Sequence, residues 1–301
     1  NLELKARKKD KRILLPESTD NRVLKAAIDI SKRNIAKVIL LGEEKSIQSK
    51  IKDLGIKTDI SIECIDPNNE KLIDKYSNLL WNKRKHKGIE LSQARELVRD
   101  RTVFSMLLLE DGQVDGVVTG AITPSKVVLG NALKIVGAKD DVDLVSSFFI
   151  MMFDKNHQQY GKEIIFSDCA MNVNPNSKEL ASIAITTAKT AKDLLGIDPK
   201  IAMLSFATHN SNKHELVIKV KDATKECKKL IKNAEIAGNI QLDAAMDPNV
   251  LKVKHPNSNF TPPANVLIFP NLDSGNIGYK LVQRFSKAQA IGPILQGLKR
   301  Q

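Results

Sequence analysis

The sequence predicts an α/β protein of two three-layer α/β/α domains, with largely parallel sheets and an active-site cleft between the domains. Its 301 residues are enough for two domains of ordinary size. Short apolar runs alternate with longer segments of helical period, which is typical of strand–helix–strand repetition. Runs such as KVILLG (37–42) and NVLIFP (265–270) are apolar on both faces, as in strands covered by helices on each side.

The apolar runs place the strands and the domain boundaries along the chain. The expected strands, in order, cover residues 12–16, 37–42, 60–65, 114–120, 144–153, 162–168, 200–206, 240–244, 264–270 and 288–295. The clearest helix is 177–195, where apolar residues recur at i, i+3, i+4 and i+7 before Gly196 ends it. We expect residues 1–142 to form the N-terminal domain, rejoined by the chain after about residue 290, and residues 143–290 to form the second domain.

The composition narrows the classes of partner. A net charge of +12, from 37 lysines and 10 arginines against 35 acidic residues, indicates an anionic ligand. The lysines are scattered, and arginine and aromatic residues are scarce, so a small phosphorylated anion is favoured over nucleic acid. No apolar run approaches the length of a membrane span and no signal peptide is visible, so we expect a cytoplasmic protein without a membrane partner. The three widely spaced cysteines predict neither a disulfide framework nor a metal site.

We expect the binding residues to follow the strands, because ligands of open α/β sheets lie beyond the carboxyl ends of the strands. In the segment 265–280 we expect a buried strand, a Gly275–Asn276 turn and then a helix. Free backbone N–H groups at such a helix start attract an anion, and Lys280 would neutralise it one turn in. A plain strand–turn–helix with a capping asparagine is the alternative.

The segment 203–211 also ends a predicted strand, and it carries three hydroxyl groups. Ser205, Thr208 and Ser211 are donors suited to a phosphate or to a developing oxyanion. Helix capping and turn formation use the same residue types, so a structural role remains open for all three.

Two segments of the N-terminal half complete the set of candidates. In 114–125 a strand meets a glycine-containing turn and a helix start with Thr123 and Ser125, which is geometry suited to an anion. In 83–88 a basic cluster that includes Arg84 closes a helix, and its alternative is charge complementarity with the helix C-terminus. The sequence contains no Walker loop, GxGxxG after a strand, HExxH or GxSxG. The residues by themselves therefore predict anion-binding turns around a cleft.

Taken in order, several segments resemble the phosphate acetyl/butyryltransferase family, and its phosphate acetyltransferases (phosphotransacetylases) in particular. These segments are ILLPES, RKHKGIEL, VDGVVTGA, KIAMLSFAT, QLDAA, ANVLIFPNLDSGNIGYKLVQR and IGPILQGL. The resemblance implies two α/β domains, a homodimer, and acetate metabolism: acetyl-CoA and phosphate are converted reversibly to CoA and acetyl phosphate by direct attack of the CoA thiolate. Coenzyme A would be a substrate, and neither a metal nor a bound cofactor is implied.

The resemblance also implies roles for particular residues. The family's phosphate-binding arginine corresponds to Arg84, its hydroxyl-rich segments to Thr123, Ser125, Ser205, Thr208 and Ser211, and its cleft residues to Asn276 and Lys280. One substrate arginine of the family is replaced by Gly130. The family's catalytic Ser and Arg belong to a DLSRG segment, followed a few residues later by the Asp base, and all of these would lie beyond Gln301. Since the sequence also begins without methionine, we expect residues to be missing at both ends.

Other readings stay open at the level of sequence. A phosphate butyryltransferase would share the same motifs, and the residue at Gly130 is compatible with a catalytically impaired member or a non-catalytic binding protein. A metal-dependent decarboxylating dehydrogenase of similar fold would need paired aspartates around Mg²⁺ or Mn²⁺, and its DxxxD pattern is not visible.

Overall fold

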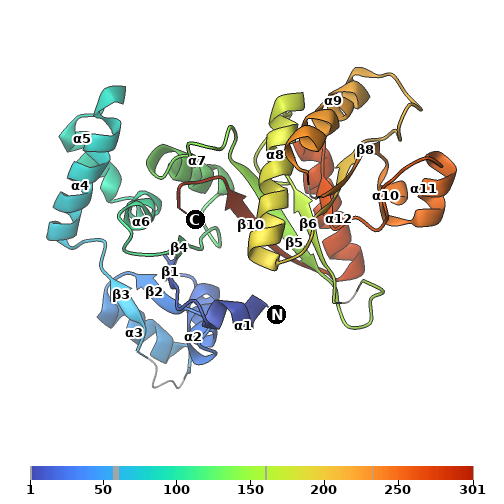
Figure 1. Ribbon diagram of the computed structural model, residues 1–301. Coiled ribbons are helices and arrows are strands. Elements are labelled where there is room, and N and C mark those ends of the chain that lie inside the picture. Colours follow the sequence, from blue (N-terminus) through green and yellow to red (C-terminus); the bar gives the residue numbers. More distant parts are fainter. Residues whose placement is uncertain (1, 57–60, 160, 233, 301) are drawn as a thin grey trace. The chain divides into compact units, whose positions relative to one another are not determined.

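The computed structural model describes residues 2–56, 61–159, 161–232 and 234–300, and the chain divides into two compact units (Figure 1). Unit 1 consists of Asn1–Gly137 and Leu298–Gln301, and unit 2 of Ala138–Gly297. Each unit contains its own β-sheet. The prediction of an α/β protein with two largely parallel sheets is confirmed.

Unit 1 is built on a four-stranded parallel sheet in the order β3–β2–β1–β4. Its strands are β1 (Arg12–Leu15), β2 (Lys37–Leu41), β3 (Glu63–Ile65) and β4 (Gly116–Val117). Its helices are α1 (Leu2–Arg7), α2 (Asn21–Lys32), α3 (Glu44–Asp53), α4 (Glu70–Arg84), α5 (Leu91–Val98), α6 (Arg101–Glu110) and α7 (Ser125–Ile135). Side chains along β1 and β2 alternate between the two faces of the sheet, and both faces are buried.

The two faces of this sheet have separate apolar layers. Under α2 and α3, strand residues such as Leu15 and Leu40 pack with Leu24 and Ile47 of the helices. Ile39, which precedes Leu40 in β2 and so points to the other face, is fully buried as well. The elements of unit 1 are labelled in Figure 1. The double coverage explains why these strands are continuous apolar runs in the sequence.

Unit 2 contains a six-stranded sheet in the order β10–β5–β6–β9–β7–β8. Its strands are β5 (Ser146–Met152), β6 (Glu163–Ser167), β7 (Lys200–Leu204), β8 (Glu235–Ile240), β9 (Val266–Ile268) and β10 (Gln289–Gln296). Strands β6, β9, β7 and β8 are mutually parallel, whereas β5 runs antiparallel to both of its neighbours. The carboxyl ends of the four parallel strands therefore meet at one edge of the sheet.

Helices cover both faces of the second sheet. One face is covered by α8 (Ser177–Thr190), which continues through a π turn (Ala191–Leu195), and by α9 (Glu215–Leu230). The other face holds α10 (Leu242–Met246), α11 (Pro248–Lys254) and α12 (Leu272–Ser286), whose residues share one apolar cluster with Phe149, Phe166 and Phe269. This arrangement places the start of α12 directly after the carboxyl end of β9.

One predicted strand is wrong, and the structure shows why. The expected strand 240–244 is replaced by α10, and the strand lies earlier, at β8. Its sequence contains Gly238 and Asn239, which weaken the strand pattern. A Cβ at Gly238 would lie 2.4 Å from Thr224 Oγ1, so close packing of α9 against β8 requires glycine there. The other expected strands are present with shorter or shifted ends, and residue 60 lies outside the described part of the chain.

Candidate functional site

The carboxyl ends of β7 and β9 border a pocket of about 310 Å³ in unit 2. Ser205 follows β7, and Asn271 and Ser274 belong to the start of α12. The rest of the lining is mostly apolar and consists of Leu204, Phe206, Leu216, Leu242, Phe269 and Pro270, together with Lys219. One of the eight predicted residues, Ser205, therefore lies in a pocket at the place where ligands of parallel sheets bind.

Lys219 is the cation of this pocket, and the sequence analysis missed it. Its Nζ donates to Asn174 Oδ1 and to the backbone oxygen of Pro270, both at 2.9 Å. Burial lowers the pKa of Lys219 below its usual value. In the sequence it is one lysine among several on an amphipathic helix, so nothing distinguishes it before the fold is known.

The start of α12 differs from the prediction. The helix begins at Leu272, capped by Asn271, whose Oδ1 accepts from the backbone N–H of Ser274 at 2.9 Å. The expected Gly275–Asn276 turn is wrong, because both residues lie inside the helix. An asparagine four residues before Gly275 supplies the cap instead.

Asn276 and Lys280 lie one turn apart on α12. Asn276 Nδ2 donates to the backbone oxygen of Cys169 at 3.0 Å, and a Cβ at Gly275 would lie 2.4 Å from the backbone oxygen of Asp168. Lys280 is exposed, with its Nζ 5.9 Å from the ring centroid of Tyr279. Asn276 therefore fixes α12 against the end of β6, and Lys280 presents its charge to solvent.

Asp168 organises the loop that receives α12, and it too was missed from the sequence. It is 2% exposed. Its carboxylate accepts from the backbone N–H groups of Ala170, Met171 and Asn172 at 3.0–3.2 Å, and from the hydroxyl of Ser147. These bonds satisfy a buried charge and hold the end of β6 in one conformation.

Thr208 and Ser211 bond within their own loop and to the start of α10. The Thr208 hydroxyl accepts from the backbone N–H of Gln241 at 3.0 Å and lies 3.2 Å from Gln241 Oε1. Ser211 Oγ accepts from the Thr208 N–H at 3.1 Å and is exposed. Thr208 thus has a positioning role, whereas the proton of the Ser211 hydroxyl can still be donated.

In unit 1 the predicted anion turn is filled by the protein's own carboxylate. Glu17 follows β1, is 5% exposed, and accepts from the backbone N–H groups of Gly120, Ala121, Ile122 and Thr123 at 2.8–3.1 Å. Burial alone would raise the pKa of Glu17, but the bonds from the Thr123 side chain and from these N–H groups outweigh it and leave the pKa lowered. Thr123 is therefore committed to Glu17.

Ser125 is the first residue of α7 and is exposed after Pro124, which offers no side-chain cap. Gly130 lies in the middle of the same helix, and a Cβ there would meet no atom within 4 Å. Lys126 is exposed one turn before it. A side chain at position 130 therefore has room.

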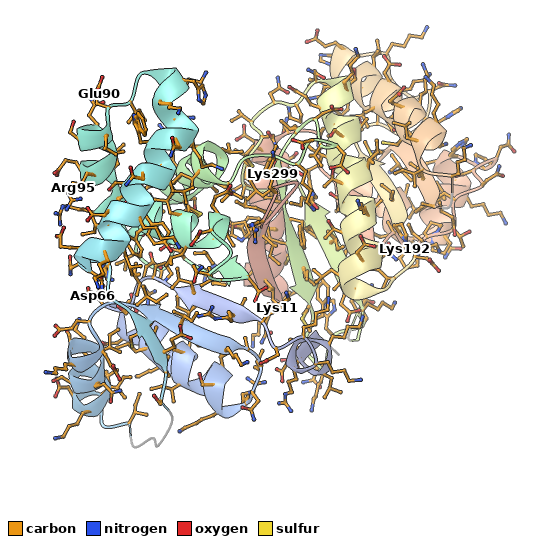
Figure 2. The ribbon with its side chains drawn as sticks, turned by 60° about the vertical axis from the view of Figure 1, so that its left-hand side comes forward. Lys11, Asp66, Glu90, Arg95, Lys192 and Lys299 are labelled. Carbon is orange, nitrogen blue, oxygen red and sulfur yellow. The ribbon has the colours of Figure 1, made fainter. Side chains whose placement is uncertain are left out.

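Arg84 ends α4 within the predicted basic cluster. Its neighbours are engaged: Lys83 pairs with Glu110, and Lys85 Nζ lies 5.0 Å from the ring centroid of Trp81. Arg95 of α5, labelled in Figure 2, is held by Glu70 and Asp74 of α4. For the guanidinium of Arg84 we find no hydrogen bond or ion pair to another described residue, so it can bind an anion.

The described residues contain no group of three or more His, Cys, Asp or Glu side chains that could hold a metal ion. Burial raises the pKa of the Cys64 thiol to about 11 and that of Cys227 to about 12, so neither is a ready thiolate. Within the part of the chain that the structure covers, no helix is both long and apolar enough to cross a membrane.

Comparison with known proteins gives consistent matches over the chain. A family model described as phosphate acetyl/butaryl transferase matches residues 1–301. The phosphate acetyltransferase of Thermoanaerobacterium thermosaccharolyticum is 45% identical over 98% of this chain and 89% of its own. That of Clostridium acetobutylicum is 45% identical over 97% of this chain and 87% of its own. Among solved structures, a phosphotransacetylase from Streptococcus pyogenes superposes with a TM-score of 0.90 at 37% identity, covering 99% of this chain and 89% of that one.

Proposed function

The chain belongs to the phosphate acetyl/butaryl transferase family, and from this premise we propose that it performs acetyl transfer by direct attack of the CoA thiolate on acetyl phosphate. The activity is that of a phosphate acetyltransferase: acetyl-CoA and phosphate are converted reversibly to CoA and acetyl phosphate. The observation that carries it is 45% identity to a phosphate acetyltransferase over 98% of this chain.

The reaction sets clear demands on the protein. The CoA thiol loses its proton to a base, the thiolate sulfur bonds to the acyl carbon, and the carbon–oxygen bond to phosphate breaks as phosphate leaves. Both substrates are phosphorylated anions, and the tetrahedral intermediate carries an oxyanion. Hydroxyl, amide and cationic donors that are not committed elsewhere are therefore the groups to expect at the substrates.

Six of the predicted residues fit this demand. Arg84 offers a planar fork for a phosphate, and Lys280 a point charge. The hydroxyls of Ser125, Ser205 and Ser211 and the side-chain oxygen of Asn276 keep hydrogen-bonding capacity toward a ligand. We assign these residues to substrate binding and none of them to the role of base.

Thr123 and Thr208 have a different part in this proposal. Thr123 bonds to Glu17, and Thr208 bonds to Gln241. They position the segments that carry Ser125 and Ser205 and do not themselves contact substrate. Lys219, which holds the start of α12, joins them as a positioning residue.

Cofactor, assembly and location follow from the same proposal. CoA acts as a substrate and no cofactor stays bound. A homodimer in the cytoplasm, where CoA and acetyl phosphate are available, is the working form. These points rest on the family and on the chemistry of the substrates.

The test is thioester formation from CoA and acetyl phosphate, followed by ultraviolet absorbance on the full-length gene product. Direct attack predicts that labelled phosphate exchanges into acetyl phosphate only when CoA is present. Exchange without CoA would instead show a covalent acetyl-enzyme. Butyryl phosphate in the same assay decides acyl preference, and a higher kcat/KM with butyryl phosphate would favour the butyryltransferase alternative.

A further inference from the structure

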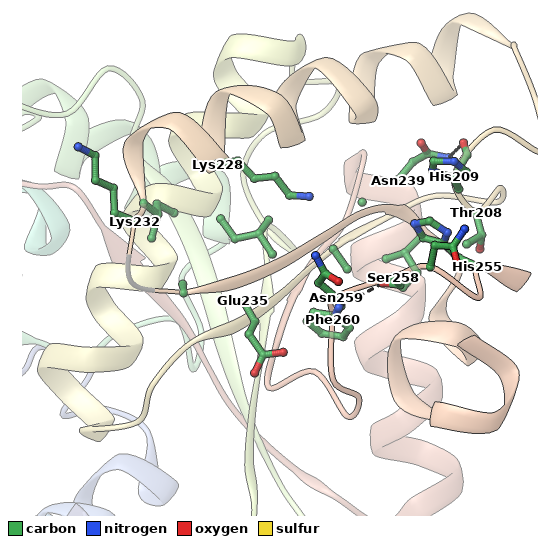
Figure 3. Close-up of a pocket in the computed structure, with 17 residues that line it drawn as sticks. Thr208, His209, Lys228, Lys232, Glu235, Asn239, His255, Ser258, Asn259 and Phe260 are labelled. Atoms are coloured by element: carbon green, nitrogen blue, oxygen red, sulfur yellow. Dashed lines mark hydrogen bonds between the residues drawn. The ribbon is translucent and has the colours of Figure 1, made fainter. Parts of the chain in front are cut away.

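A second hollow in unit 2, which we call the β8 recess, has a volume of about 640 Å³. Its floor is β8, one wall is the end of α9 with Lys228 and the segment after it with Lys232, and the other wall is the loop 255–260 (Figure 3). It shares no lining residue with the pocket at Ser205. The volume lies in the range of small-molecule sites.

Two kinds of occupant can be considered for the β8 recess, an added peptide strand and a small molecule. β8 is the last strand of its sheet, and an open edge strand can pair with an added strand. Here, however, Ala237, Asn239 and Ile240 are only 7%, 3% and 2% exposed. The side chains of Ala237 and Ile240 pack into the core of unit 2, and the strand lines a hollow between two walls. This geometry favours a small molecule over an extended peptide.

The charges in the recess are arranged for an anion. Figure 3 shows the Lys228 amine directed along β8 toward the end where His209 and His255 lie, whereas the amine of Lys232 points away. Glu235 is the acidic side chain among the described lining residues. It is already engaged, since its carboxylate lies 3.6 Å from Lys200 Nζ.

The two imidazoles are stacked, with ring centroids 4.1 Å apart and planes inclined by 13°. A lysine can only donate, so Lys221 Nζ, 3.0 Å from Asn210 Oδ1, orients that amide with its NH₂ toward His209 Nε2. His209 Nε2 lies 3.0 Å from the side-chain amide of Asn210.

The surroundings of His255 disfavour a proton on its ring. Burial lowers the pKa of His255, and the nearby His209 and Lys228 lower it further. Glu235, held by Lys200, does not offset this charge. An anion bound beside Lys228 would reverse the balance and stabilise protonated His255.

We propose that the β8 recess binds a small molecule through a diphosphate group, which Lys228 and protonated His255 contact. Inorganic phosphate is too small to fill the recess, whereas a nucleoside diphosphate would extend along β8 between the two walls. Because binding takes up a proton on His255, affinity decreases as pH rises through the pKa of that histidine.

The experiment is a titration of the full-length protein with inorganic pyrophosphate and, separately, with ADP, while the histidine ring resonances are recorded by NMR. The His255→Asn variant identifies the His255 resonance by its loss. Lys228→Gln is the test variant, and Lys232→Gln, with the same change of charge on the same wall, is the matched control. Unfolding temperatures confirm that all variants are folded.

We expect saturable movement of the His255 resonance and an increase in its pKa with either probe. Because one charge-assisted contact is lost, the probe concentration at half-saturation should rise about tenfold in Lys228→Gln. It should change little in Lys232→Gln. Tighter binding of ADP than of pyrophosphate identifies a nucleotide as the ligand class, and equal binding identifies the diphosphate alone. The proposal is overturned if saturating probe leaves the His255 resonance unmoved, or if both lysine variants weaken binding equally. Transferase activity is measured separately and is expected to be unchanged in all three variants.

Discussion

At Glu17 the protein supplies its own anion to backbone donors that the sequence suggested for a substrate. The glycine-containing turn before Ser125 does present N–H groups to a negative charge, as predicted. Its occupant is a carboxylate from the end of β1, about a hundred residues earlier in the chain. No local pattern reveals such a partner, because the pairing exists only once β1 and β4 lie side by side.

Glu17→Gln should therefore destabilise the protein and spare substrate affinity. The amide can accept fewer of the N–H bonds and carries no charge, so we expect a loss of about 1–3 kcal/mol in the free energy of unfolding. Chemical denaturation at pH 7 measures it, with the exposed Glu96→Gln as control. A selective change in the KM for phosphate, with stability unchanged, would instead show that the turn binds substrate.

The pH dependence of Glu17 has a definite sign. Its pKa in the folded protein lies below the ordinary value of 4.5. The stabilisation is therefore complete above that value and is lost as pH falls through the folded pKa. Wild-type stability should decline more steeply than that of Glu17→Gln below about pH 4.5.

Arg84→Lys tests the second candidate segment of unit 1, residues 83–88. If the guanidinium binds a substrate phosphate, a lysine loses the two-point contact and the KM for CoA or acetyl phosphate rises. Stability should stay within about 0.5 kcal/mol, because no described residue pairs with Arg84. Lys87→Gln removes a neighbouring exposed charge and serves as the control. A collapse in stability would assign the cluster to helix capping.

Among the helices and strands, the ends that carry a local sequence signal could be predicted, whereas ends without such a signal could not. The predicted helix 177–195 corresponds to α8 and its π turn, because a capping box at Asn176 and a left-handed Gly196 mark its ends. The predicted start of α12 was wrong, because Asn276 and Asn271 are both residues of a type that caps helices, and the cap is Asn271. The strand at β8 was missed because its glycine is required by packing against α9.

Two glycines inside helices give opposite predictions for the same substitution. Gly130→Ala meets no neighbour within 4 Å and should stabilise α7 by up to about 1 kcal/mol. Gly275→Ala would place a Cβ 2.4 Å from the backbone oxygen of Asp168, so it should destabilise by about 1–3 kcal/mol. Thermal unfolding of both variants checks the pair, and stabilisation by Gly275→Ala would contradict the close approach of α12 to β6.

Gly130→Arg tests whether a side chain at the same position can take part in substrate binding. The resemblance implies an arginine here, and the open space around Gly130 can hold one. If it binds a substrate anion, kcat/KM should rise about tenfold or more, since a charge-assisted bond contributes about 1.5–3 kcal/mol. Lys126, one turn earlier, is the partial substitute, so Lys126→Ala should lower kcat/KM in the wild type. Lower activity in Gly130→Arg, with no effect of Lys126→Ala, would remove α7 from the substrate site.

At the scale of the molecule, short motifs identified the family but did not separate binding residues from structural ones. Gln296, within IGPILQGL, is 1% exposed and donates to Ser146 and Thr187, so this motif position builds the core of unit 2. Conversely, Asp168 and Lys219 carry no motif, although they hold the loop and helix start beside the Ser205 pocket. Their partners lie on other elements, which only the fold brings together.

The whole protein should work without a divalent metal. No described cluster of side chains can hold one, and the proposed reaction needs only positive charge and hydrogen-bond donors at the phosphate and the oxyanion. The excess of basic over acidic residues, a net charge of +12, supplies positive charge that attracts the anionic substrates at long range. Dialysis against a strong chelator should therefore leave kcat, KM and the unfolding temperature unchanged, with a mock-dialysed sample as control. A large loss of activity that Mg²⁺ or Mn²⁺ restores would show that a metal takes part and would require a ligand set outside the residues described.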